Sequence, residues 1–271
     1  MDSALPPELG SAQAAAAVLA APIKRVCGDV FETAAPHAPT GSLASPAPRL
    51  HVDGLMIDTA DVLYDATRWP RRLQRLLAGL GLTVSYAQMV ADWEHNYLAD
   101  VHCGRREYDE AFGAFLLAAG LSWAQIDEVE AASRIERQSL ELGVRPLPGV
   151  VTTCKKLQAS SLPMIAWADS AQPADKVAQR LIRLGLGGCF RAVLSSLELE
   201  AAQPSPRCYQ AALEVLALPA GRMAYVGHDT LHLAAARACG LATVGFNHAP
   251  DAAADFYLTG FDQLLALLEL A

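Results

Sequence analysis

The sequence predicts an α/β protein, with a parallel sheet between layers of helices and an all-helical segment inserted after the first strand. Three observations predict this fold class. A short apolar run near residue 55 ends in an acidic residue. Residues 66–142 show only helical periodicity, and from residue 146 onward apolar runs alternate with helical patterns. Strands that alternate with helices are typical of parallel sheets covered on both faces.

The first predicted strand is the apolar run from Leu55 to Ile57, which is followed by Asp58. The block after it carries apolar residues at i, i+3 and i+4 spacing, which indicates amphipathic helices. These positions are Leu73, Leu76, Leu77 and Leu80, then Ala111, Phe112, Phe115 and Leu116. Four glycines, at positions 81, 104, 120 and 143, divide the block into three or four helices.

The second half alternates regularly between the two kinds of element. We expect strands at 164–168, 192–194, 223–226 and 242–246. We expect helices at 150–160, 172–185, 206–217, 231–239 and about 261–270. Residues 51–65 and 146–271 are therefore expected to form the core domain, and residues 66–145 a helical cap.

Residues 1–50 differ from the rest because they are rich in alanine and proline. Such a composition cannot bury much apolar area, so we expect a disordered tail. A secretory signal needs a basic region before its apolar stretch, whereas this chain has Asp2 and Glu8 there.

Composition excludes several classes of partner. The chain has 21 Lys+Arg against 29 Asp+Glu, a net charge of -8, which argues against nucleic acid. No apolar run is long enough to cross a bilayer, so no membrane partner is expected. None of the six cysteines forms a C-x-x-C pair, and free thiols favour a cytoplasmic location. The expected partners are a small anionic ligand or another protein.

Polar residues follow each predicted strand, at the sheet edge where ligands of parallel sheets bind. They are Asp58, then Asp169 and Ser170, then Ser195 and Ser196, then His228 and Asp229. Several carboxylates at one edge repel each other unless a cation such as Mg²⁺ offsets them. The alternative is that Asp169 and Asp229 each cap the following helix.

The order of these segments resembles the haloacid dehalogenase-like (HAD) hydrolases. Asp58-Thr59-Ala60-Asp61-Val62 resembles their nucleophile motif, and Trp167-Ala168-Asp169-Ser170 falls at the second motif. Gln203-Pro204-Ser205-Pro206 falls at the lysine motif, and Gly227-His228-Asp229 at the acidic motif. The resemblance covers about residues 52–270. It implies a Rossmann-like core under a helical cap, with Asp58 as the nucleophile that forms an aspartyl-phosphate.

The same resemblance shows which groups this chain lacks. The acid/base position holds Ala60, the Ser/Thr position Ala168 and the lysine position Gln203. The acid of the fourth motif is displaced to Asp229 or replaced by His228. A bound Mg²⁺ would then use Asp58, the main-chain carbonyl of Ala60 and Asp229.

Two other segments could supply positive charge. Lys176, early in the helix after the second motif, could reach over the sheet edge, or it could be an exposed helix lysine. Arg105 and Arg106 in the cap could clamp an anionic substrate, or they could belong to a polar loop.

Two functions follow from these observations. The first is a catalytically degenerate HAD-like protein that binds a ligand or a protein partner. The alternative is a HAD-family hydrolase, a Mg²⁺-dependent phosphatase or a dehalogenase-like enzyme, that acts on a small anionic substrate through Asp58. A halide leaving group would not need the missing acid, although Gln203 departs from the dehalogenase pattern as well. The imine chemistry of phosphonoacetaldehyde hydrolases needs a cap lysine, and residues 66–142 contain none.

Overall fold

Six parallel strands form a single sheet in the order β3-β2-β1-β4-β5-β6, in a computed structural model that describes residues 49–269. The strands are β1 (Gly54–Asp58), β2 (Met164–Ala168), β3 (Ala192–Ser195), β4 (Met223–Gly227), β5 (Ala242–Phe246) and β6 (Phe256–Leu258). The predicted fold class is confirmed. The edge strand β6 was not predicted, because three residues are too few to show alternation. The tail predicted over residues 1–50 lies almost entirely outside the described residues.

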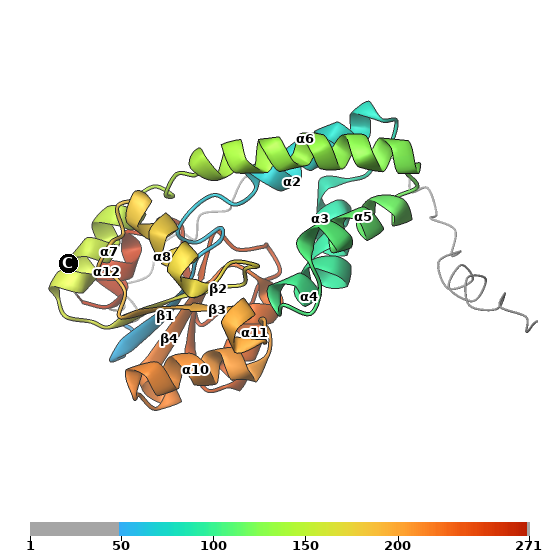
Figure 1. Ribbon diagram of the computed structural model, residues 1–271. Coiled ribbons are helices and arrows are strands. Elements are labelled where there is room, and N and C mark those ends of the chain that lie inside the picture. Colours follow the sequence, from blue (N-terminus) through green and yellow to red (C-terminus); the bar gives the residue numbers. More distant parts are fainter. Residues whose placement is uncertain (1–48, 270–271) are drawn as a thin grey trace, which may run out of the picture. The chain divides into compact units, whose positions relative to one another are not determined.

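Two layers of helices cover the sheet (Figure 1). One face packs against α7 (Val150–Ala159), α8 (Ala174–Arg183) and α12 (Gln263–Leu267), and the other against α10 (Pro206–Leu216) and α11 (Thr230–Ala238). Alternation along β1 divides its side chains between these layers, because Leu55 and Ile57 lie in the first core and Met56 in the second. Two further short helices are α9 (Ser196–Leu199) and the 3-10 turn η2 (Ala220–Arg222).

The segment between β1 and α7 is entirely helical. It contains α2 (Arg68–Gly79), α3 (Tyr86–Trp93), the π-helix η1 (Glu94–Leu98), α4 (Ala99–His102), α5 (Tyr108–Ala118) and α6 (Trp123–Leu142). Ser122 starts α6 with a capping box, in which its hydroxyl accepts from Gln125 N and the Gln125 side chain accepts in return. The cap has its own apolar cluster, with the ring of Trp93 5.8 Å from Phe112 and 5.3 Å from Phe115.

Polar contacts at Glu141 and at His102 join the cap to the core. Arg180 of α8 donates to both carboxylate oxygens of Glu141 at the end of α6, at 2.6 and 2.8 Å, and to the Tyr64 hydroxyl at 2.9 Å. The hydroxyl of Ser196 donates to the carbonyl of His102 at 2.9 Å. These bonds fix both ends of the cap against the edge of the sheet that carries the candidate site.

The remaining sequence expectations concern thiols and membrane helices. Cys103, Cys154, Cys189, Cys208 and Cys239 are all free thiols. Within residues 49–269, no helix combines the length and the apolar character needed to cross a bilayer.

Candidate active site

The carboxyl ends of β1, β2 and β4 meet at the centre of the sheet. In β1, which lies between the other two, Asp58 is in register with Trp167 of β2, and Ile57 is in register with Val226 of β4. Asp169 and His228, which directly follow β2 and β4, therefore lie beside Asp58. The structure brings together Asp58, Asp169, Gln203 and His228, four of the residues that the sequence singled out.

The carboxylate of Asp58 is held on both oxygens, and its side chain is only 6% exposed. Oδ1 accepts from Thr59 N at 2.9 Å, and Oδ2 accepts from the Tyr225 hydroxyl at 3.2 Å. Two imidazoles face the same Oδ2: His228 Nδ1 lies 3.7 Å away and His232 Nδ1 4.0 Å away. Asp58 is thus fixed in one orientation, with nitrogen atoms on one side of it.

Tyr225 reaches Asp58 because the end of β4 is glycine. A Cβ at Gly227 would lie 2.4–2.6 Å from the ring and hydroxyl of Tyr225. Any larger residue at 227 would therefore displace the phenol from Asp58. This glycine is required by close packing at the site.

Gln203 occupies the lysine position and connects Asp58 with Asp169. Its backbone N donates to Asp169 Oδ1 at 3.1 Å, and its Nε2 donates to the Tyr209 hydroxyl at 3.3 Å. Its Oε1 lies 3.5 Å from the Tyr225 hydroxyl as a second acceptor. The side chain is buried, and it supplies hydrogen bonds at the position where the lysine motif would supply a charge.

Asp169 is a buried carboxyl group with a raised pKa at this edge of the sheet. Burial raises the pKa of Asp169 to about 7; the negative charge of Asp58 adds to this rise, whereas His232 opposes it. A buried carboxyl group that keeps its proton near neutral pH can act as an acid beside a nucleophile.

Ala168, at the Ser/Thr position of the resemblance, brings no hydroxyl to the site. Ala168 packs into the core beneath α7 and α8, together with Ala166. Trp167 belongs to the opposite face of the sheet, and alternation puts Asp169 on that face with Asp58. Asp169, and not Ala168, is the residue after β2 that faces the nucleophile.

Asp61 does not replace the acid missing at Ala60. It has a left-handed backbone, with φ at 55°, and its Oδ1 accepts from Ala66 N at 2.8 Å. Burial raises the pKa of Asp61, with His228 opposing the rise. Its carboxyl group closes the turn after β1.

Asp229 caps α11. Its Oδ1 accepts from Leu231 N at 2.8 Å and from His232 N at 3.0 Å. His232 lies between the two carboxylates, because its Nε2 is 3.8 Å from Asp229 Oδ1 while its Nδ1 faces Asp58. The helix-capping alternative therefore describes Asp229, and its role as a metal ligand stays a prediction.

The residues beside Asp58 do not fit Mg²⁺. This ion requires an octahedron of oxygen ligands, whereas the ionisable groups nearest to Asp58 Oδ2 are two imidazoles. In residues 49–269, no group of three or more His, Cys, Asp or Glu side chains could hold a metal ion. The set of Asp58, the main-chain carbonyl of Ala60 and Asp229 stays a prediction.

Ser170 belongs to the link between core and cap. Its backbone N donates to the Ser196 hydroxyl at 2.9 Å, and that hydroxyl donates to the His102 carbonyl. Burial, together with the nearby His232, lowers the pKa of His102 to about 4, so this imidazole is neutral.

The basic side chains considered from the sequence make no hydrogen bond or ion pair with Asp58 in residues 49–269. Lys176 is exposed on α8, and its side chain makes none of the hydrogen bonds and ion pairs found in the described part of the chain. Arg105 pairs with Asp100 at 2.7 Å and Arg106 with Glu110 at 3.0 Å, both within the cap. Lys176 is therefore an exposed helix lysine, and Arg105 and Arg106 belong to a polar loop.

Three site residues were missed from the sequence: His232, Tyr225 and Glu94. His232 lies in the first turn of α11, which begins two residues after His228. Tyr225 shares the face of Asp58 because β4 alternates. Glu94 lies on η1; burial of its carboxyl group raises its pKa, with His228 acting in the opposite direction and Asp229 and Asp61 adding to the rise. Nothing in the helical pattern indicated a π-helix there.

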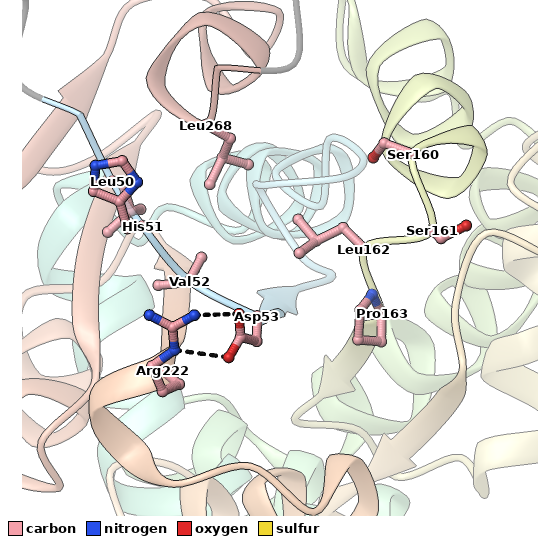
Figure 2. A pocket seen from close by; sticks show the side chains of 10 residues that line it. All are labelled: Leu50, His51, Val52, Asp53, Ser160, Ser161, Leu162, Pro163, Arg222 and Leu268. Atoms are coloured by element: carbon pink, nitrogen blue, oxygen red, sulfur yellow. Dashed lines mark hydrogen bonds and ion pairs between the residues drawn. The ribbon is translucent and has the colours of Figure 1, made fainter.

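A pocket lies at the amino ends of the strands, opposite the candidate active site, and its lining differs from that of the site (Figure 2). It is lined by Leu50, His51, Val52, Asp53, Ser160, Ser161, Leu162, Pro163, Arg222 and Leu268. Arg222 donates from Nε to Asp53 Oδ2 at 2.7 Å across it, so its charged groups already satisfy each other.

Comparison with known proteins identifies the family. Residues 52–240 match the haloacid dehalogenase-like hydrolase family. The chain belongs to the haloacid dehalogenase-like hydrolases. It is 26% identical over 203 residues, 73% of this chain and 67% of the other, to the phosphoglycolate phosphatase of Pseudomonas fluorescens.

Solved structures of the HAD fold resemble it closely. A HAD family hydrolase of Deinococcus radiodurans, with bound phosphate and sodium, superposes with a TM-score of 0.60 at 19% identity, covering 81% of this chain and 96% of that one. The protein YfnB of Bacillus subtilis, bound to magnesium, gives 0.61 at 16% identity, covering 81% and 100%. At these identities the likeness shows the HAD fold alone.

Proposed function

We propose that this HAD protein is a hydrolase of small phosphate esters, with Asp58 as the nucleophile. One observation carries the proposal: the Asp58 carboxylate is held by Thr59 N and Tyr225 at the centre of the sheet edge, where a substrate of a parallel sheet binds. The phosphatase name of the Pseudomonas fluorescens relative and the phosphate bound to the Deinococcus radiodurans structure support the substrate class. Neither comparison supports a catalytically degenerate protein.

The reaction has two steps. A carboxylate oxygen of Asp58 attacks phosphorus, and the bond from phosphorus to the ester oxygen breaks, so that an aspartyl-phosphate and an alcohol form. Water then attacks the same phosphorus, which releases phosphate and restores Asp58.

Both steps need a proton donor and acceptor, which Ala60 cannot supply. In our proposal Asp169 gives its proton to the leaving alcohol and takes one back from the attacking water. Its pKa of about 7 suits both directions near neutral pH. Gln203 orients Asp169 through the bond from its backbone N.

The site also limits the substrate. The charged neighbours of Asp58 and Asp169 are histidines and acids, since Arg105, Arg106 and Lys176 are directed elsewhere. A substrate with further negative groups would meet Asp61 and Glu94, so we propose a small ester that carries a single phosphate.

The test is turnover of a panel of small phosphate esters, with divalent ions added singly. Asp58→Asn should abolish turnover, whereas Asp53→Asn should retain it, because Asp53 lies at the other end of β1 and pairs with Arg222. A parallel arm uses 2-haloacids, whose halide needs no proton. Release of halide without turnover of any phosphate ester would overturn the phosphatase proposal, as would equal turnover in Asp58→Asn.

A further inference from the structure

The loop that begins with Asp169 is held by the core and also packs against the cap. It spans residues 169–173, between β2 and α8. The hydroxyl of Ser195, at the end of β3, donates to the Gln172 carbonyl at 2.7 Å and ties the loop to the sheet. Ala171, in the same loop, packs against the apolar cluster of the cap. The placement of Asp169 therefore depends on the cap as well as on the core.

A single hydroxyl, that of Ser196, joins this loop to the cap. Ser196 is a fully buried residue of α9. Its Oγ accepts from Ser170 N at 2.9 Å and donates to the carbonyl of His102, the last residue of α4, also at 2.9 Å. The cap backbone runs close to α9 here, because a Cβ at Gly104 would lie 3.0 Å from Leu197 Cδ1. One side chain thus contacts both the cap and the residue that follows the proposed acid.

The Ser196 hydroxyl has a second acceptor within reach. The Ser170 carbonyl lies 3.5 Å from Oγ, which is too long for a strong O–H···O bond of about 2.5–3.0 Å. A serine hydroxyl has one hydrogen, and while the cap is docked the closer His102 carbonyl accepts it. When the cap moves away, the buried hydroxyl needs another acceptor. A bond of about 2.8 Å to the Ser170 carbonyl would then draw the loop inward by about 0.7 Å.

We propose that Ser196 is a positioning residue, which places Asp169 for proton transfer only while the cap is docked. Asp169 Oδ1 is held from the core by Gln203 N at 3.1 Å, so a shift of Ser170 strains or breaks that bond. A misplacement of about 1 Å in an active site can cost about 100-fold in rate. The inference rests on the proposed function, because it requires Asp169 to be the acid. It adds that the cap acts on this acid through one hydroxyl.

The first arm of the experiment is hydrogen exchange on the full chain and needs no turnover. Ser196→Ala should raise exchange at least about tenfold at residues 171–174, whose amides do not bond to Ser196, as well as at residues 99–103. Ser133→Ala is the matched control, because its equally buried hydroxyl bonds only to the Glu130 carbonyl, and it should leave residues 171–174 unchanged. Melting temperatures establish that the variants are folded. Ser196→Cys, a weaker donor of similar size, is the second variant and should give a smaller rise. A rise confined to residues 99–103 would overturn the inference.

The second arm is a double-mutant cycle with Asp169→Asn, using the alkyl phosphate that the natural protein hydrolyses fastest, since an alkyl leaving group needs a proton. Ser196→Ala should lower kcat about 10- to 100-fold and change KM less than about threefold, because the acid acts only in the transition state. In the Asp169→Asn background, it should lower kcat by less than a further factor of about two, since no acid remains to be placed. Equal losses in both backgrounds, or a loss that appears in KM, would overturn the inference and leave the proposed function standing. Undiminished kcat in Asp169→Asn alone would overturn the proposed acid, and with it this role of Ser196.

Discussion

The hydroxyl of Tyr225 donates to Oδ2 of Asp58 at 3.2 Å, and this is the oxygen that both histidines face. The bond joins the end of β4 to the end of β1 inside a fully buried part of the sheet. A neutral donor therefore stabilises the nucleophile in a place without lysine or arginine.

Tyr225→Phe removes this donor and should lower the free energy of unfolding by about 1–2 kcal/mol, because a buried carboxylate oxygen loses its partner. Urea denaturation followed by circular dichroism measures the change. Tyr97→Phe is the control: its ring packs on Trp93, and its hydroxyl makes no hydrogen bond in the described residues. Equal losses in both variants would show that the bond to Asp58 contributes nothing.

Asp169→Asn should make stability less dependent on pH. The folded pKa of Asp169 is about 7 against 3.8 in the unfolded chain, so the folded state binds the proton more tightly. The stability this gives the natural protein is complete below about pH 4 and is lost as the pH rises to about 7. Asparagine has no such loss and still accepts from Gln203 N.

The asparagine variant should therefore gain at least about 1 kcal/mol over the natural protein between these pH values, the equivalent of one pKa unit. Denaturation at a series of pH values, on protein stripped of metal, measures the difference. Asp175→Asn, on exposed α8, controls for the loss of a surface carboxylate. A difference for Asp169→Asn that stays constant from about pH 4 to about pH 7 would contradict the raised pKa.

Gln203→Lys should strengthen the binding of inorganic phosphate at least about tenfold. The ammonium would lie between Asp58 and Asp169, and a charged donor contributes about 1.5–3 kcal/mol where a neutral one contributes about 1. Calorimetry with phosphate measures the effect. Gln203→Met, of similar length but without charge or donor, should bind more weakly than the natural protein; tighter binding by the methionine variant would exclude the electrostatic reason.

Ser196→Ala should loosen the cap. The buried hydroxyl accepts from Ser170 N and donates to His102 O, so its loss leaves two polar groups unpaired and should cost about 1–3 kcal/mol. Hydrogen exchange should rise first at residues 99–103. Ser133→Ala is matched in burial, but its hydroxyl bonds only to the Glu130 carbonyl within its own helix, and it should cost less. A larger effect at Ser133 would contradict this role of Ser196.

The sequence by itself determined the α/β fold, the helical insertion and the place of Asp58 at the end of the first strand. These follow from local patterns: period-two and period-3.6 apolar spacing, and the rule that strand ends meet at one edge. Gln203 was placed at the site by the same rule, because its segment follows the carboxyl end of β3.

Only the tertiary structure decided which polar residues face Asp58. The register of β2 against β1 turns Ala168 into the core and Asp169 toward the nucleophile. Asp229 is the N-cap of α11, and His232 lies in the first turn of that helix. Their different roles therefore depend on where the helix begins. Lys176 lies on α8, and the packing of that helix leaves its side chain exposed. Side-chain direction is set by packing between distant segments, which local pattern does not encode.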